Sequence, residues 1–272
     1  MKFALIDGNR EEAQPGLLGK CPCCDAPLIP RCGEERARHW AHKGERHCDR
    51  WWENETNWHI AWKDRFPTDW QEYVHRAEDG ERHIADVRTG DGWAIEFQHS
   101  YIKPEERRSR EAFYPRLAWV VDGLRRGRDK TRFLKSWDES SPVTRASPVR
   151  SVWSGEGALF RDWVDSRAHV FFDFGEEEVL WWLSPISDDM WAFVARVSRE
   201  EFIRAHRRTT TEGADGFDSF VAGLGRLIPE EEVRRQAQRL EPPPPRPQQD
   251  IFLLLRNSMD QRRRGRGRYR RW

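Results

Sequence analysis

Hydrophobic and polar positions along the chain follow first the period of a helix and then that of strands. From 51 to 66, WWENETNWHIAWKDRF places apolar side chains three and four positions apart, which predicts an amphipathic helix ended by Pro67. Three strand patterns follow at 71–76, 82–88 and 93–99. Pro104 then opens a charged helix of about ten residues, and a fourth strand is predicted at 117–123. The predicted order is therefore α-β-β-β-α-β.

A second region follows a linker rich in serine, threonine and proline. Its apolar runs HVFFDFG, EVLWWL and WAFVARV predict an antiparallel meander, with a helix near 199–208. The stretch EPPPPRPQQD excludes a helix or a central strand and predicts an extended spacer before a disordered tail. We divide the chain into an N-terminal module (1–50), a core (51–138), the linker (139–148), a meander with helices (149–240), and a spacer with a tail (241–272).

The composition indicates a water-soluble chain with a modest core. Of the 272 residues, 37% are hydrophobic and 34% are charged. No apolar run approaches the roughly 20 residues needed to cross a bilayer. The N-terminus MKFALIDGNREE lacks a signal-peptide pattern, so we expect a cytoplasmic protein without membrane contact.

The formal net charge of +1 conceals a segregation of charge by sign. Basic residues exceed acidic ones at 101–135, and acidic residues exceed basic ones at 151–200. Such a chain can carry a local polyanion-binding face. The acidic, Trp-rich second region suits a protein partner, bound through 150–240, better than it suits DNA.

The last residues, QRRRGRGRYRRW, hold seven arginines and no acid. Arginine alternating with glycine and aromatics is typical of segments that bind nucleic acid without sequence preference. A merely solubilising tail is the alternative. The tail residues that we predict to contact nucleic acid are Arg262, Arg263, Arg264, Arg266 and Arg268.

Residues 83–100, HIADVRTGDGWAIEFQHS, predict a hairpin with an acid in each strand. Because side chains alternate along a strand, Glu96 and Gln98 share one face, and Asp86 approaches Glu96 across the turn. Two adjacent carboxylates repel each other unless a proton or a cation lies between them, and oxygen ligands suit Mg²⁺ or Mn²⁺. The alternative is the solvent-facing side of an ordinary hairpin.

The predicted first helix carries an acid and an imidazole within an aromatic stripe of Trp52, Glu55, His59, Trp62 and Phe66. If the stripe packs on the sheet, Glu55 and His59 are partly buried and need partners. Either they pair with each other one turn apart, or both line the pocket that holds Asp86 and Glu96.

All five cysteines lie within residues 21–48 of the N-terminal region, where they indicate a metal site in a reducing compartment. Cys21 and Cys24 have the Cys-x2-Cys spacing that gives two thiolates to Zn²⁺. His39 and His42 have a matching spacing for the second pair, and Cys48 competes with them. We expect a closed structural zinc site; a reduced, metal-free set of cysteines is the alternative.

The strings WENETNWHIAWK, HIADV, IEFQHS, REAFY and LAWVVDG occur in an order that resembles the CoiA-like competence-protein family. The CPCC and HWAH segments resemble that family's N-terminal region, so the resemblance covers about residues 1–123. It implies a fold of the α/β (α+β) class: a PD-(D/E)XK restriction-endonuclease-like αβββαβ core with a small N-terminal zinc-binding module. A C-terminal antiparallel β/α region follows that core.

The resemblance also implies roles for particular residues. Asp86 matches the metal-binding aspartate and Glu96 the second acid, whereas Gln98 stands where the family signature usually has lysine. Glutamine cannot deprotonate water, but its amide can orient it. Glu55 and His59 would assist placement of the metal ion or of water. The residues that would meet phosphate are Lys63, Arg110 and Tyr114.

The patterns and the resemblance together predict a Mg²⁺-dependent nuclease that hydrolyses phosphodiester bonds of DNA. The resemblance alone, and not the chemistry of the residues, implies that the substrate is incoming or foreign DNA. The alternative is a non-catalytic DNA-binding or recruitment protein on a nuclease-like scaffold, and Gln98 is the residue that favours it.

Overall fold

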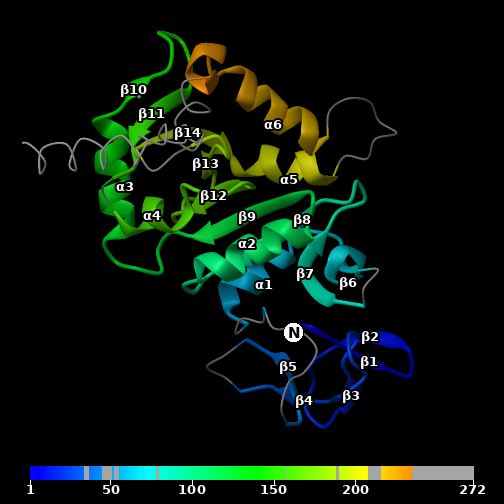
Figure 1. The fold of residues 1–272 in the computed structure, drawn as a ribbon. Coiled ribbons are helices and arrows are strands. Elements are labelled where there is room, and N and C mark those ends of the chain that lie inside the picture. Colours follow the sequence, from blue (N-terminus) through cyan, green and yellow to red (C-terminus); the bar gives the residue numbers. More distant parts are fainter. Residues whose placement is uncertain are drawn as a thin grey trace, which may run out of the picture. The chain divides into compact units, whose positions relative to one another are not determined.

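The computed structural model describes residues 1–33, 37–44, 51, 55–77, 80–155, 157–187, 190–207 and 216–234. They form a mixed α/β structure with two sheets (Figure 1). The chain divides into two compact units, 1–236 and 237–272, and every described residue belongs to the first. The predictions for Trp52, Cys48, the spacer and the arginines of the tail therefore concern residues outside the described ranges.

The first sheet is antiparallel and has the order β2-β1-β3-β4-β5. Its strands are β1 (Phe3–Ile6), β2 (Asn9–Glu12), β3 (Gly19–Lys20), β4 (Pro27–Arg31) and β5 (His39–His42). Ala4, Leu28 and Trp40 form part of its small core. A Cβ at Gly19 would lie 2.6 Å from the Cβ of Ala4, so only glycine allows β1 and β3 to approach this closely.

The second sheet has nine strands in the order β10-β11-β14-β13-β12-β9-β8-β7-β6. The strands are β6 (Gln71–Arg76), β7 (Arg82–Arg88), β8 (Ala94–Gln98), β9 (Leu117–Asp122), β10 (Ser141–Pro142), β11 (Val149–Trp153), β12 (His169–Asp173), β13 (Val179–Leu183) and β14 (Trp191–Ser198). The helices are α1 (Asn57–Lys63), the short η1 (Thr68–Trp70), α2 (Pro104–Phe113), α3 (Asp129–Asp138), α4 (Ala158–Trp163), α5 (Arg199–Arg207) and α6 (Phe217–Arg226).

The predicted α-β-β-β-α-β order is confirmed as α1, β6, β7, β8, α2 and β9, with η1 before β6. β6, β7 and β8 pair antiparallel, and α2 connects β8 to the parallel strand β9. Helix α1 is shorter than predicted, because Thr56 caps it and its hydroxyl accepts a hydrogen bond from the backbone N–H of His59.

The predicted meander is confirmed, since β12, β13 and β14 pair antiparallel. It does not form a sheet of its own, because β12 pairs in parallel with β9 and continues the same sheet. The predicted linker also contributes, since Ser141 and Pro142 pair with β11. Pairing with β9 satisfies backbone groups that a separate meander would leave at an open edge.

Side chains alternate between the two faces of the large sheet, and each face packs in a separate apolar layer. Trp119 and Val121 of β9 pack in one layer with residues of α3 and α4, and Val120 packs in the other with residues of α1, α5 and α6. Helices α5 and α6 are yellow and orange in Figure 1. The sheet is thus covered on both faces, and polar side chains within it need protein partners.

Candidate functional site

Lys63, at the end of α1, lies at the centre of a buried cluster of carboxylates and is itself only 2% exposed. Its Nζ is 2.6 Å from Oε1 of Glu55, 3.0 Å from Oε1 of Glu72 and 3.3 Å from Oδ1 of Asp86. The N-terminal ammonium of Met1 lies 3.2 Å from Oε2 of Glu55. Glu55 and Asp86 therefore contact a common cation, as predicted of these acids, but that cation is an ammonium group.

The cluster shifts the pKa of several members. Burial by itself would raise the pKa of Glu55, but the ammonium groups of Lys63 and of the N-terminus lower it overall. Burial would lower the pKa of Lys63, and the carboxylates of Glu55, Glu72 and Asp86 raise it well above its usual value. Glu55 and Lys63 are consequently both ionised at neutral pH, and Glu55 is a weak base.

Glu72 is a member of this cluster that no sequence pattern identified. It is buried in β6 with a φ of 46°, in the left-handed region that costs a non-glycine residue free energy. Its two carboxylate oxygens accept hydrogen bonds from the backbone N–H of Lys2 at 2.6 Å and of Phe3 at 3.0 Å. Glu72 thus links the start of the first sheet to Lys63, and its only sequence signal is an acid in a strand.

Glu96 and Gln98 belong to a different environment from the Lys63 cluster. Oε2 of Glu96 lies 3.0 Å from a guanidinium nitrogen of Arg110 on α2, whereas neighbouring Ile95 and Phe97 pack in the layer that contains α1. Nε2 of Gln98 donates to the carbonyl of Ser100 at 3.1 Å. Asp86 and Glu96, which we predicted to share a cation, thus contact different cations.

The acids are of the right chemical kind for Mg²⁺, yet their arrangement does not fit a magnesium site. Oδ2 of Asp86 accepts from the backbone N–H of Phe97 at 2.9 Å, and Oδ1 contacts Lys63. Glu96 contacts Arg110. A metal ion between them would meet carboxylates already compensated by an ammonium and a guanidinium, so the residues present do not fit such an ion.

Three residues predicted to meet phosphate are buried, which corrects that expectation. Lys63, Arg110 and Tyr114 are 2%, 6% and 3% exposed. Arg110 also contacts Glu106 at 2.6 Å and the carbonyl of Trp51. Arg110 is buried because α2 packs part of its basic face on the sheet, where Glu96 compensates the guanidinium, and Lys63 of α1 is compensated by its own carboxylate partners.

His59 is buried and takes part in capping α1. Its Nδ1 lies 2.8 Å from Oγ1 of Thr56, and the backbone N–H of Thr56 reaches the same nitrogen at 3.3 Å. Its ring lies 6.0 Å, centroid to centroid, from the ring of His99. Glu55 precedes the helix, so the predicted one-turn spacing of Glu55 and His59 on a common helix is wrong.

The predicted zinc ligands are brought together in part. Potential ligand atoms of Cys21, Cys24 and His42 all lie within 4.8 Å of one another, and within the described ranges no other group of three or more such residues does so. Sγ of Cys24 lies 3.5 Å from Nε2 of His42. Asp25 has a φ of 59°, so the chain reverses directly after Cys24. These three residues could hold a metal ion.

His39 is not part of the group, which corrects its assignment as a zinc ligand. Both histidines lie in β5, where residues three apart point to opposite faces. Nδ1 of His39 instead lies 2.8 Å from the carbonyl oxygen of Ala37. The competing ligand Cys48 lies outside the described residues, and no disulfide joins any two of the four described cysteines.

Three neighbouring parallel strands, β8, β9 and β12, end at one edge of the large sheet. His99 follows β8, and Asp122 and Asp173 end β9 and β12. Asp173 accepts hydrogen bonds from the indole N–H groups of Trp58 and Trp62 at 3.1 and 2.9 Å, which anchors α1 to this edge. The sequence signal that we overlooked is a polar residue directly after each apolar strand.

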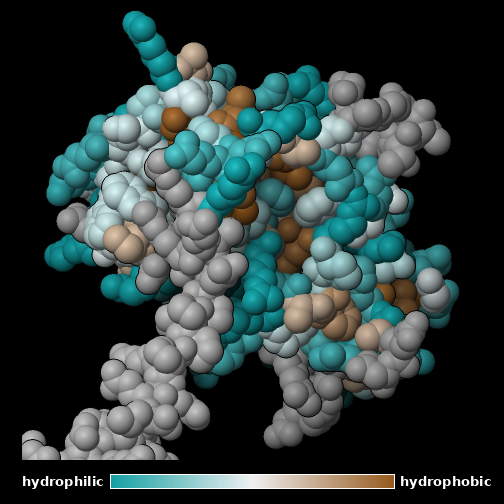
Figure 2. Space-filling model, turned by 45° about the horizontal axis from the view of Figure 1, so that its top comes forward, coloured by the Kyte–Doolittle hydropathy of each residue, from teal (hydrophilic) through white to brown (hydrophobic). Residues whose placement is uncertain are grey.

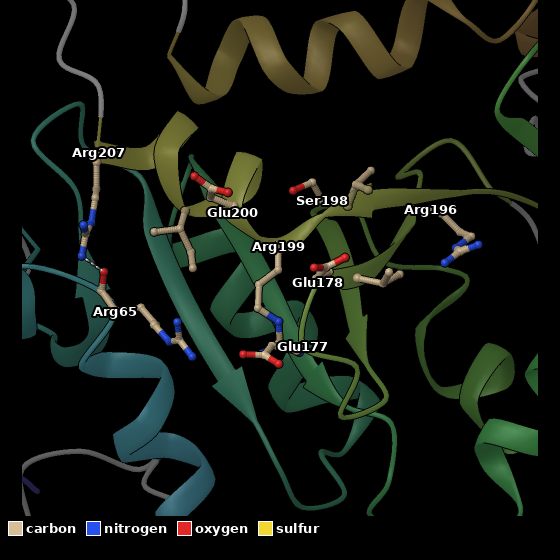
Figure 3. Close-up of a pocket in the computed structure, with 11 residues that line it drawn as sticks. Arg65, Glu177, Glu178, Arg196, Ser198, Arg199, Glu200 and Arg207 are labelled. Atoms are coloured by element: carbon tan, nitrogen blue, oxygen red, sulfur yellow. Dashed lines mark hydrogen bonds between the residues drawn. The ribbon is translucent and has the colours of Figure 1, made fainter.

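A cavity of about 900 Å³ lies elsewhere, around the start of α5 (Figure 3). Arg65 and Arg207 lie together at one side of it, with the Arg207 guanidinium donating to the Arg65 carbonyl. Glu177, Glu178 and Glu200 also line it. Because both signs of charge line this cavity, it has no preference for a polyanion.

The surface in Figure 2 is mainly hydrophilic, with hydrophobic residues gathered in small patches. Within the part of the chain that the structure describes, no helix combines the length and the apolar character required to cross a membrane.

No family model, no curated protein and no solved structure matches this chain. The resemblance to the CoiA-like family therefore stays a prediction made from the motifs.

Proposed function

We propose that this protein is a nuclease of the PD-(D/E)XK class that hydrolyses phosphodiester bonds of DNA. The observation that carries the proposal is the contact of Lys63 with Glu55 and Asp86, at 2.6 and 3.3 Å. The PD-(D/E)XK signature combines acids with a lysine, and Gln98 cannot supply that positive charge. Lys63 on α1 would supply that charge beside Asp86 and Glu55, whereas the second acid of the signature, Glu96, pairs with Arg110.

The order and pairing of α1, β6, β7, β8, α2 and β9 also support the proposal, because they agree with the core implied by the CoiA-like resemblance. Membership of that family, a cytoplasmic location and a role in processing incoming or foreign DNA belong to the same proposal. The group of Cys21, Cys24 and His42 would hold a structural Zn²⁺ that organises the N-terminal module.

We also propose that the cleavage of DNA depends on Mg²⁺ or Mn²⁺. The test incubates plasmid and single-stranded DNA with the full chain in Mg²⁺, Mn²⁺ or EDTA. We expect cleavage by the parent, and a loss of about 100-fold or more in the Asp86→Ala and Glu96→Ala variants. Glu139→Ala is a matched control, because this exposed carboxylate pairs with the exposed Lys135 across 3.8 Å.

Circular dichroism establishes that each variant is folded. If Asp86→Ala and Glu96→Ala cut DNA as fast as the parent and the Glu139→Ala control, the assignment of the site is wrong.

A non-catalytic DNA-binding protein is the second candidate. It is favoured by the compensation of Asp86 by Lys63 and of Glu96 by Arg110, which stabilises the acids as structural ion pairs. Binding of DNA without cleavage under every metal condition would support this reading. Removal of residues 256–272 tests the Arg-rich tail, and a smaller salt dependence of binding is the expected result.

A further inference from the structure

We propose that His99, oriented by Asp122, is the general base of the hydrolysis, which deepens the function proposed above and rests on it. Nδ1 of His99 lies 2.7 Å from Oδ2 of Asp122. A carboxylate only accepts hydrogen bonds, so this nitrogen carries the proton and Nε2 is the basic atom of the neutral ring. An aspartate that holds an imidazole in this tautomer also stabilises the imidazolium that forms when the ring takes up a proton.

Asp122 is itself held in place, which gives the histidine a fixed support. Its Oδ1 accepts a hydrogen bond from the backbone N–H of Leu124 at 2.8 Å, and its side chain is 9% exposed. The rings of Trp58 and His59 from α1 lie 6.2 and 6.0 Å from the imidazole, centroid to centroid. The pair thus lies near both the end of β9 and helix α1.

The side chain of His99 is more exposed than those of three ionisable groups near the proposed site and than that of Asp86, which is 22% exposed. The side chains of Glu55, Lys63 and Glu96 are 5%, 3% and 6% exposed. The imidazole of His99 is 39% exposed, although it follows directly after Gln98 in the chain. A substrate that approaches the carboxyl end of β8 therefore meets this ring.

The remaining candidates for a base are chemically unsuited. Gln98 has no basic atom. Glu55 is held by Lys63 and the N-terminal ammonium, and Glu96 by Arg110. The lowered pKa of Glu55 means that it binds a proton too weakly to deprotonate water efficiently, and the guanidinium of Arg110 already occupies a carboxylate oxygen of Glu96. His99 fills the role that these three residues cannot perform.

In the proposed step, the oxygen of a water molecule forms a bond to phosphorus while its proton passes to Nε2 of His99. The bond from phosphorus to the leaving sugar oxygen breaks, and that oxygen takes a proton from solvent. The products are a phosphate monoester and an alcohol. The imidazolium, paired with Asp122, then releases its proton to solvent, which restores the starting state.

The test measures DNA cleavage by the full chain and by the His99→Ala and Asp122→Asn variants, with and without added imidazole. We expect kcat to fall by about 100-fold in His99→Ala. Added imidazole should raise the kcat of His99→Ala by at least about tenfold, because the exposed position leaves space for a free imidazole base. Asp122→Asn should also lower kcat, but added imidazole should not restore it, because the side chain of His99 still occupies the position of the base.

His75→Ala is the matched control, a partly buried histidine on β6 whose ring packs against Tyr73 and Tyr114. It should retain the parent kcat and show no response to imidazole. If folded His99→Ala cleaves within about threefold of the parent, or loses activity that imidazole does not restore, His99 is not the base. In that case a loss of cleavage in Asp86→Ala would still support the nuclease, whereas an inactive parent overturns both proposals.

Discussion

The two halves of the nine-stranded sheet differ in what they bury. In β12, β13 and β14 the buried side chains are mainly apolar, among them Phe171, Trp182 and Phe193. In β6 and β8 the buried side chains include Glu72, Glu96 and Gln98, with Lys63 and Arg110 brought in from the helices.

This difference supports the proposed position of the site, because both halves belong to one sheet covered by helices on both faces. Burying a charge costs several kcal/mol unless it is paired, and apolar residues of similar volume stabilise a core at least as well. Within the described residues of β12–β14, Asp173 is the buried acid, and it lies at a strand end. Buried charge concentrated in one half is therefore typical of a functional site.

The largest effect is expected in the apolar half. Trp182→Ala should lower the free energy of unfolding by about 4 kcal/mol, because this fully buried indole would leave a cavity. Urea denaturation followed by circular dichroism measures the loss. Trp153→Ala is the control, since this residue is 42% exposed and should change stability by less than about 1 kcal/mol. Equal losses would contradict the described burial.

Lys63→Met should destabilise the charged half by about 3 kcal/mol, because it leaves the carboxylates of Glu55, Glu72 and Asp86 without their common cation. Adding Glu72→Gln to the same chain should recover part of that loss, since it removes one of the uncompensated charges. Denaturant unfolding of both single variants and the double variant gives the coupling free energy. Strict additivity would show that the contact contributes nothing.

The apolar layer also predicts a dependence of stability on pH. Burial lowers the pKa of His206 to about 3, whereas an unfolded histidine titrates near 6.5. The unfolded state therefore takes up the proton first, so stability is complete above about pH 6.5 and decreases as the pH falls toward about 3. The slope is on the order of 1 kcal/mol per pH unit.

His206→Phe should remove this contribution while preserving the packing against Phe217, whose ring stacks on His206 with centroids 3.6 Å apart. Unfolding free energies at several pH values between about 6 and 4 measure the slope. Identical slopes in parent and variant would mean that His206 does not remain neutral in the folded state.

Loss of zinc should have the smallest effect on the stability of the large sheet. Purified protein should contain about one equivalent of Zn²⁺, and His42→Ala should lower this content, whereas His39→Ala should not. Unfolding of the nine-stranded sheet should change by less than about 1 kcal/mol in either variant, because the group lies in the first sheet. Equal zinc loss in both variants would contradict the assignment of His42 over His39.

Local patterns were enough to predict the type and order of the elements from 57 to 123, because helix and strand periods are properties of neighbouring residues. They also identified Cys21 and Cys24, which are close in the chain, as a pair of ligands. His39 was assigned wrongly because a spacing of three residues has a different meaning in a helix and in a strand.

Only the tertiary structure decided which charge meets which. Lys63 reaches Asp86 because α1 lies near β7, and Glu96 meets Arg110 because α2 covers the other face of β8. His99 and Asp122 come together because their strands are parallel neighbours. Contacts of this kind join residues far apart in the chain, and strand pairing and helix packing determine them. Residue spacing therefore indicated which residues need partners, and the fold selected those partners.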